Sequence, residues 1–322
     1  MSNPTSGTPS LKKHTDGAPA VPPIVVLMLA VLGISTAAPL VRLSHALPLT
    51  IVVWRLAFSL IVIGGFVLPG RQWRQYVRLS RADFSLALAA GVLLACHFWA
   101  WTVSLGLTTV AASTVLVNMQ PVVVGVLSAL LLSEPPSKRQ WLGIAVAVVG
   151  AVIIARADAS AQGGARNALL GDGLALASGV AAACYYLAGR RLRRVLDLWP
   201  YVALVYGACF VALLAAALAT HAPLGPEPPR ELAVFAGLAV GPMLLGHTGM
   251  NWALRYLPAP VVNVTTLGEP VGATMLAAFL PWIHEWPAPA TLAGGAIVLA
   301  GIACTLIPAR GRSGVAVGVE VL

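Results

Sequence analysis

The sequence predicts an all-α integral membrane protein with ten transmembrane helices, arranged as two inverted five-helix repeats. Hydrophobic residues make up 58% of the 322-residue chain and charged residues only 10%, whereas soluble proteins are about 25% charged. Ten apolar stretches follow one another at nearly even spacing, with lengths near the roughly 20 residues that cross a bilayer as a helix. The composition therefore favours a protein whose helices lie in lipid.

A pattern of five marker residues in the first half returns in the second half, 149 to 151 positions later. The markers are His97, Pro121, Glu134, Gly143 and Gly150, and their counterparts are His247, Pro270, Glu285, Gly294 and Gly301. Each copy holds five spans, and an odd number of spans forces the second copy into the bilayer upside down. Two inverted copies that enclose a site at the bilayer midplane are typical of secondary transporters.

The chain divides into five parts. Residues 1–22 are polar and rich in Pro, Ser and Gly, so we expect a disordered cytoplasmic N-terminus. Residues 24–155 form the first repeat, 156–170 a polar, Gly-rich linker, 171–307 the second repeat, and 308–322 a cytoplasmic tail. The expected spans are 24–41, 48–68, 84–106, 111–132, 140–155, 171–189, 199–219, 232–254, 260–280 and 288–307.

The lysine and arginine residues predict the orientation of these spans. With a cytoplasmic N-terminus, 15 of the 20 lie on the cytoplasmic side and 4 on the other, while Arg55 lies within a span. This bias follows the positive-inside rule, so we expect an inner-membrane protein with both termini in the cytoplasm. Because the cations lie in loops, the net charge of +9 does not indicate a nucleic-acid partner. The expected partners are the lipid bilayer and a small-molecule substrate; the pattern does not define an oligomeric state.

Several motifs resemble one protein family. They are Trp54–Arg55 in the second span, "NMQPVVVGVLSALLLSEPPSKRQWLGIAVAVVGAVII" (118–154), and "TTLGEPVGATMLAAFLPWIHEWPAPATLAGGAIVLAGI" (265–302). With a proline inside the fourth span, a glutamate at its end and Glu-Pro in the ninth span, residues 24–307 are similar to the EamA family of the drug/metabolite transporter (DMT) superfamily. The resemblance implies a ten-span transporter of amino acids, other metabolites or toxic compounds. The stretch "PWIHEWP" departs from the shorter Gly-Glu turn expected there.

Ionisable side chains inside a bilayer cost on the order of 2.5–3.5 kcal/mol each, so each one suggests a functional role. His97 and His247 lie at matching points of the two copies, and Trp101 and Asn251 each follow four residues later. That spacing puts each pair on one helix face, and we expect both faces to line one central cavity. The alternative for each histidine is a buried neutral ring bonded to a backbone carbonyl. Arg55 could bind a substrate carboxylate, or it could be a structural cation.

Two prolines mark breaks at matching places in the fourth and ninth spans. Gln120 precedes Pro121, and Glu269 precedes Pro270; each proline leaves the carbonyl four residues earlier without its helical donor. Matched discontinuous helices point to a transporter site. The same faces carry Thr114, Asn118, Asn263 and Thr266. Glu269 could bind a proton or a cationic substrate group, or it could be a structural acid bonded to another helix.

These observations favour a secondary transporter that exports a small, amino-acid-like metabolite by alternating access, with proton coupling left open. A passive facilitator, a membrane scaffold and an intramembrane enzyme are the alternatives. The chain has no HExxH or GxSxG motif and no paired aspartates within spans, so we expect no catalytic residues. The four cysteines show no metal spacing, and we expect neither metal nor cofactor. The glycines spaced seven apart in spans five and ten predict helix-packing faces, and Glu134 predicts an ion pair at a membrane boundary, near Lys138 and Arg139.

Overall fold

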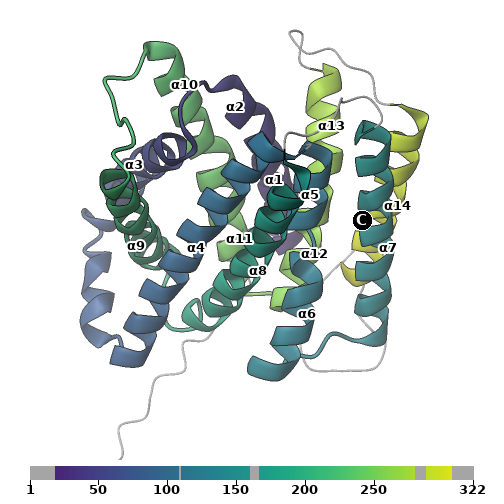
Figure 1. Ribbon diagram of the computed structural model, residues 1–322. Coiled ribbons are helices and arrows are strands. Elements are labelled where there is room, and N and C mark those ends of the chain that lie inside the picture. The colour runs from purple at the N-terminus through teal and green to yellow at the C-terminus, as the bar shows by residue number, and fades with distance from the viewer. Residues whose placement is uncertain (1–18, 109, 160–166, 280–287, 307–322) are drawn as a thin grey trace, which may run out of the picture.

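In the computed structural model, residues 19–108, 110–159, 167–279 and 288–306 are described, and all regular secondary structure within them is helical (Figure 1). Eight segments in these ranges are long and apolar enough to cross a membrane. They are Pro23–Leu43, Pro48–Val67, Arg81–Leu107, Ala112–Leu131, Ala168–Leu192, Leu198–Ala219, Pro229–Ala253 and Pro289–Leu306. The prediction of an all-helical membrane protein is confirmed. Helices also occupy the other two expected spans, but the count of ten crossings stays a prediction.

The first half contains seven α-helices and one 3-10 helix in the described ranges. They are α1 (Pro23–Ser35), α2 (Ala37–Leu43), α3 (Pro48–Val67), η1 (Gln72–Arg78), α4 (Arg81–Leu107), α5 (Val110–Val117), α6 (Gln120–Leu131) and α7 (Lys138–Ala159). The start of α4 has a side-chain cap, because Ser80 Oγ accepts a 3.0 Å hydrogen bond from the backbone N–H of Asp83. Such caps satisfy the free amides of a first helical turn.

The second half begins with two continuous helices and continues with two interrupted ones. Its elements are α8 (Ala168–Leu192), α9 (Leu198–Ala219), α10 (Pro229–Leu238), the π-helical η2 (Ala239–His247), α11 (Thr248–Ala253), α12 (Ala259–Val264), the 3-10 helix η3 (Thr265–Gly268), α13 (Glu269–Phe279) and α14 (Pro289–Leu306). The stretch "PWIHEWP" and its Glu285 lie outside the described residues, as do both chain ends.

Four spans are interrupted next to a proline, and each break has the same cause. A proline cannot donate to the carbonyl four residues before it. For Pro39, Pro121 and Pro242 that carbonyl belongs to the last residue of the preceding helix, at the ends of α1, α5 and α10. For Pro270 it belongs to Thr266, within the 3-10 turn η3. The sequence predicts two of these breaks, in spans four and nine; the structure adds those in spans one and eight.

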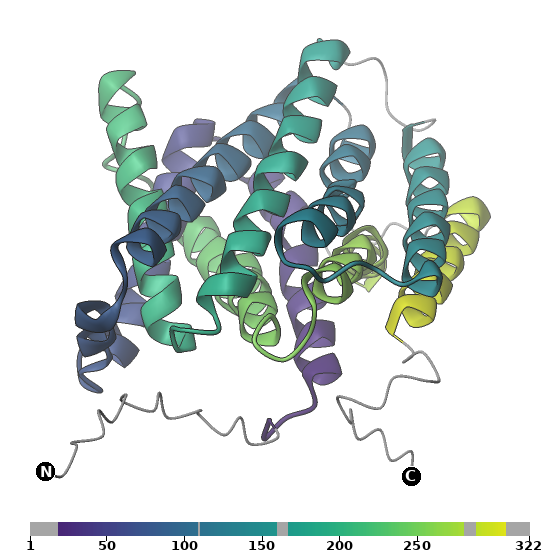
Figure 2. The ribbon, with the colours of Figure 1, turned by 90° about the horizontal axis from the view of Figure 1, so that it is seen from below.

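Helices α7 and α14 lie side by side at one edge of the molecule in both ribbon views (Figures 1 and 2). A Cβ atom at Gly143 would lie 2.6 Å from the carbonyl oxygen of Gly301, and one at Gly150 would lie 2.7 Å from that of Gly294. No side chain fits at these positions, so the backbones approach closely, as small residues allow in lipid. The predicted packing faces are confirmed, and they pack against each other.

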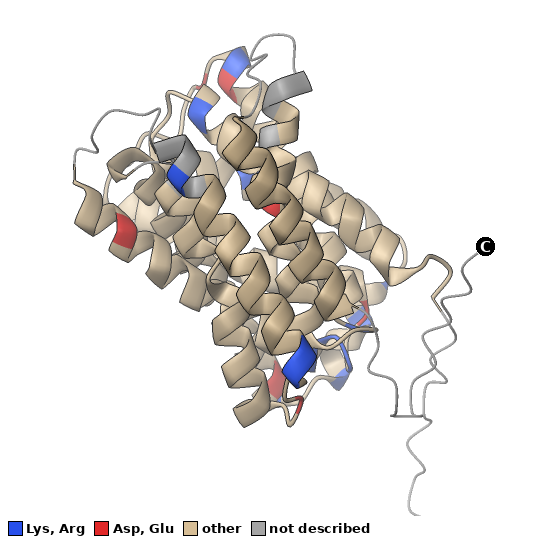
Figure 3. Cartoon of the chain, turned by 90° about the vertical axis from the view of Figure 1, so that its right-hand side faces the viewer, with Lys and Arg blue, Asp and Glu red and all other residues tan. Residues whose placement is uncertain are grey.

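The interior of the bundle is formed by α4, which packs against α8 and α9, and by α3, which packs against α9. Four tyrosines, Tyr185, Tyr186, Tyr201 and Tyr206, are fully buried there. Charged residues gather near the two ends of the helices, while the stretch between the ends carries few charges (Figure 3). This distribution matches the energetics of a bilayer-spanning bundle.

Candidate functional site

The four interrupted spans meet around a cavity of about 40 Å³ inside the bundle. Its wall includes the bend between α1 and α2, the break between α5 and α6, the π-helix η2, and the turn from η3 into α13. Eight of the residues singled out from the sequence line it. Those from the first half are Arg55, His97, Trp101, Asn118 and Gln120, and those from the second half are His247, Thr266 and Glu269.

The two matched breaks contact each other directly across the cavity. Gln120 Nε2 donates to Thr266 Oγ1 at 3.0 Å, and Asn118 Nδ2 donates a long bond of 3.4 Å to Glu269 Oε2. Thr266 Oγ1 in turn donates to the carbonyl of Asn263 at 2.8 Å. Side chains next to the breaks therefore supply polar partners for one another, which is how irregular backbone persists at membrane depth.

The two histidines lie side by side in this cavity, with ring centroids 5.9 Å apart. Nδ1 of His97 lies 2.8 Å from Ser178 Oγ, which itself donates to the carbonyl of His97 at 3.0 Å. Nδ1 also lies 3.2 Å from the backbone carbonyl oxygen of Ser178, which can only accept, so the network assigns a proton to Nδ1. Nδ1 of His247 lies 3.2 Å from the hydroxyl of Tyr186. His97 therefore lines the cavity and at the same time has its ring hydrogen-bonded to another helix, so the two alternatives considered for it are both met.

Arg55 is the only arginine or lysine that lines the cavity among the described residues, and 3% of it is exposed. Its guanidinium carbon lies 4.2 Å from the centroid of the Phe98 ring, a cation–π contact. Within the part of the chain that the structure describes, Arg55 Nε and Nη2 have no hydrogen-bond partner, and neither has Trp101 Nε1. Buried polar groups are nearly always paired, so unpartnered donors on two residues of the cavity wall mark candidate binding groups.

Three of the expected cavity residues lie elsewhere. The amide of Asn251 donates to the hydroxyl of Tyr185 and to the carbonyl of His247 at 2.8 Å, so it points into the buried tyrosines and away from the cavity. Asn263 Nδ2 donates to the carbonyl of Ala259 at 3.1 Å within its own helix. Thr114 is buried and accepts at its carbonyl from Asn118. For Asn251 a bond to another helix, and for Asn263 a bond within its own helix, outweighs the shared helix face that suggested a cavity position.

Other residues that line the cavity were not expected from the sequence. Phe98, Tyr186 and Pro242 belong to its wall, with Ile34 from the end of α1. Pro242 carried a usable signal, because it is a further proline inside an expected span, five residues before His247. π-Helical turns are frequent at functional sites, and η2 delivers that histidine to the cavity.

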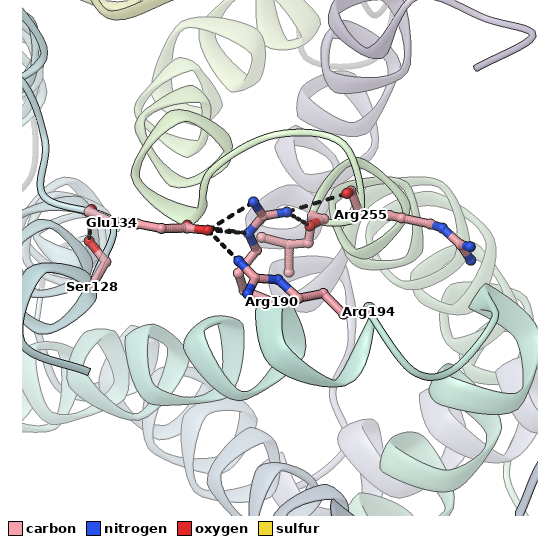
Figure 4. Close-up of polar contacts among 6 residues, drawn as sticks. Ser128, Glu134, Arg190, Arg194 and Arg255 are labelled. Atoms are coloured by element: carbon pink, nitrogen blue, oxygen red, sulfur yellow. Dashed lines mark hydrogen bonds and ion pairs between the residues drawn. The ribbon is translucent and has the colours of Figure 1, made fainter. Parts of the chain in front are cut away.

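A second polar cluster joins the two halves at the end of α6 (Figure 4). Glu134 accepts hydrogen bonds from Arg190 Nε at 3.1 Å and Nη2 at 2.9 Å, and from Arg194 Nη2 at 2.5 Å. Arg190 Nη1 also donates to the carbonyls of Leu254 at 2.6 Å and Arg255 at 3.3 Å. The boundary ion pair expected for Glu134 therefore forms with α8 of the second half, whereas Lys138 and Arg139 are exposed.

The cluster extends to the start of α9. Arg255 Nη1 lies 2.9 Å from Asp197 Oδ1, and Gln75 Nε2 donates to Asp197 Oδ2 at 2.8 Å. Burial alone would raise the pKa of Asp197, but these hydrogen bonds outweigh it and hold the pKa below its usual value. Asp197 is therefore ionised at neutral pH. Among the described residues, no group of three or more His, Cys, Asp or Glu side chains could hold a metal ion.

Comparison with known proteins gives three findings. Residues 21–156 and 169–307 each match the model of the EamA-like transporter family. A probable terminal-alkyne amino-acid exporter of Streptantibioticus cattleyicolor is 29% identical over 282 residues, which cover 80% of this chain and 91% of that protein. A protein of known crystal structure is 20% identical and aligns with a TM-score of 0.70 over 88% of this chain and 96% of its own; that likeness shows the fold alone.

Proposed function

The chain belongs to the EamA-like transporter family, and from this membership we propose that it exports a small, amino-acid-like metabolite across the inner membrane by alternating access. It is a multi-pass membrane transporter and not an enzyme. The amino-acid class is suggested by the name of the Streptantibioticus relative. The two helix breaks that meet at one cavity carry the proposal, because transporter sites form where discontinuous helices of two repeats meet.

The charges in the cavity support this use. Arg55 and Glu269 line the same small cavity inside the bundle. Ionisable groups in such surroundings are costly and mark substrate or ion pathways. A scaffold has no use for a buried pair of opposite charges that do not bond to each other, so transport explains them better.

In the conformation described, the cavity is too small to hold a substrate. A volume of about 40 Å³ gives room for about three ordered waters, and a substrate needs more. The cluster of Glu134, Arg190 and Arg194 joins α6 of the first half to α8 of the second, at the end that we propose to face the cytoplasm. Opening that side requires these ion pairs to separate, as alternating access demands.

The proposal keeps ten crossings, with α7 and the α12–α13 segment completing the two repeats, and both termini in the cytoplasm. Lys and Arg residues define that side by the positive-inside rule. Glu269 could add proton coupling, and a passive facilitator would lack it. The two differ in one measurement: a coupled exporter moves substrate against its gradient when a proton gradient is imposed, whereas a facilitator does not.

The direct test is a growth-tolerance screen in bacteria that overproduce the protein, challenged with excess amino acids and their analogues. We expect resistance to at least one compound and faster release of that compound from preloaded cells. The matched control is the Glu269→Gln variant at equal membrane abundance, which should confer less resistance. Wild-type protein that is present in the membrane but changes neither tolerance nor release for any member of the panel would contradict the proposal.

A further inference from the structure

We propose that the cavity recognises both poles of an amino acid: Arg55 binds the carboxylate through its Nε–Nη2 edge, and Glu269 binds the amine. This inference rests on the proposed export function and narrows its substrate to zwitterions. It follows from the hydrogen-bonding positions that Arg55 and Glu269 leave without a partner. Neither the fold nor the family membership determines those positions.

Arg55 presents one complete edge of its guanidinium without a partner. Nε and Nη2 are both buried, and neither has a hydrogen-bond acceptor among the described residues. These two nitrogens carry parallel N–H donors on the same side of the planar group, the fork that matches a carboxylate in a bidentate pair. The ring of Phe98 covers one face of the guanidinium, so the group is held in place while its edge stays available.

An unpaired buried donor costs free energy, and two on one charged group are not retained for packing alone. No described carboxylate forms an ion pair with Arg55. An incoming carboxylate would satisfy both donors at once. The preformed edge is therefore a binding site for the acidic end of the substrate.

Glu269 provides the opposite pole of the same cavity. Its side chain receives one long bond of 3.4 Å from Asn118, and Asn118 makes a shorter bond of 2.9 Å to the carbonyl of Thr114. A carboxylate has about four acceptor positions, so Glu269 keeps most of its capacity. No described lysine or arginine forms an ion pair with it. An ammonium group with three donors fits this position.

The matching residue of the first half shows the contrast. Gln120 lies at the equivalent place before its proline, and its amide is occupied by Thr266 at 3.0 Å. The first break thus carries a neutral side chain that is bonded to the second half, and the second carries an acid with free acceptor positions. Two poles of opposite sign reject compounds that lack either partner, because a buried charge is then left unpaired.

The experiment uses purified full-length protein in liposomes loaded with three matched sets of compounds. The first set is L-alanine, L-valine, L-leucine and L-phenylalanine; the second is their amides, which lack the carboxylate; the third is their N-acetyl derivatives, which lack the cationic amine. Release is measured by mass spectrometry. We expect at least one free amino acid to leave at least tenfold faster than its amide and its N-acetyl derivative.

Variants then assign each pole. Arg55→Gln should slow release of the free amino acid at least tenfold. The difference between the release rates of the free amino acid and its amide should also become smaller. In the Glu269→Gln variant, the free amino acid should leave only slightly faster than its N-acetyl derivative. The free amino acid should still leave much faster than its amide. Arg55→Lys keeps the charge but not the fork and should lose most of the rate. The control is Arg42→Gln, an exposed arginine outside the cavity, with no expected change.

Each outcome is decisive. Equal release of all three sets by the wild type would overturn the two-pole inference and leave the export function standing. Release of none of the compounds would overturn both. Selectivity unchanged in Arg55→Gln and Glu269→Gln variants that still transport would show that other residues read the substrate.

Discussion

Replacement of Glu134 with glutamine removes the negative charge on which the cluster at the end of α6 is built. The shape of the side chain is nearly kept, but the ion pairs with Arg190 and Arg194 are lost. If that cluster holds the cytoplasmic side closed, the variant should open on that side more often. The same change should leave the packing around the cavity intact, because Glu134 does not line it.

The magnitude follows from the exposure of the partners. Arg194 is 54% exposed, so its pair with Glu134 contributes little, about 0.2–1 kcal/mol. The Arg190 and Glu134 side chains are only 12% and 18% exposed, and hydrogen bonds to charged groups contribute about 1.5–3 kcal/mol. Glutamine keeps one acceptor oxygen, so we expect a net shift of about 1–2 kcal/mol, which is about 5- to 30-fold in the equilibrium between closed and open states.

Cysteine labelling measures this shift. In a background without the four native cysteines, Val117→Cys places one thiol in the cavity wall. A membrane-impermeant maleimide applied to inside-out vesicles should label it about 5- to 30-fold faster in the Glu134→Gln variant, since the labelling rate follows the open population.

The matched control is Asp197→Asn. Asp197 forms its ion pair with Arg255 within the second half, and an asparagine can still accept the hydrogen bond that Gln75 of the first half donates, so labelling should not change. Labelling at the wild-type rate in Glu134→Gln would refute the role of the cluster in closing this side. Acceleration only in right-side-out vesicles would refute the proposed orientation.

Three further predictions address packing, coupling and topology. A Cβ atom at Gly301 would lie 2.5 Å from a backbone nitrogen of α7, so Gly301→Val should lower stability by about 1–3 kcal/mol or more. Thermal unfolding in detergent measures this loss. The control is Gly64→Ala, where the added Cβ meets open space and no loss is expected. Glu269→Gln should keep the fold and surface expression but lose most transport or its pH dependence. Transport at the wild-type rate with an unchanged pH profile would show that Glu269 is a neutral residue with a structural role only. A cytoplasm-active reporter fused after Arg194 should be active and one fused within 160–168 inactive, and reversed activities would refute the inverted repeat.

Much of the cavity could be predicted because the two copies repeat at a nearly constant offset. The offset pairs His97 with His247, and the structure brings their rings to 5.9 Å. The prolines at the start of α6 and α13 point to the same place, because a missing N–H interrupts a helix in any context. These are local rules, and they hold without knowledge of the neighbouring helices.

Partner choice between distant helices could not be predicted in the same way. Helical spacing puts Asn251 on the face of His247, yet its amide bonds to the hydroxyl of Tyr185 on another helix. Glu134 is near Lys138 in the sequence, but its partners are Arg190 on α8 and Arg194 just after that helix. A single sequence gives the direction of a side chain within its own helix, and tertiary packing decides which group it meets.

The two copies share their backbone plan and differ in charge at the place where this matters most. The break before Pro121 has Gln120, whose amide is bonded across the cavity, while the break before Pro270 has an acid with free acceptor positions. Two acids at these matched points would put like charges on one small cavity, where each disfavours the ionised form of the other. One neutral break and one acidic break avoid that cost. Gln120 at the neutral break then holds the two interrupted helices together. Glu269 at the acidic break remains available, with Arg55, for a substrate that carries both charges.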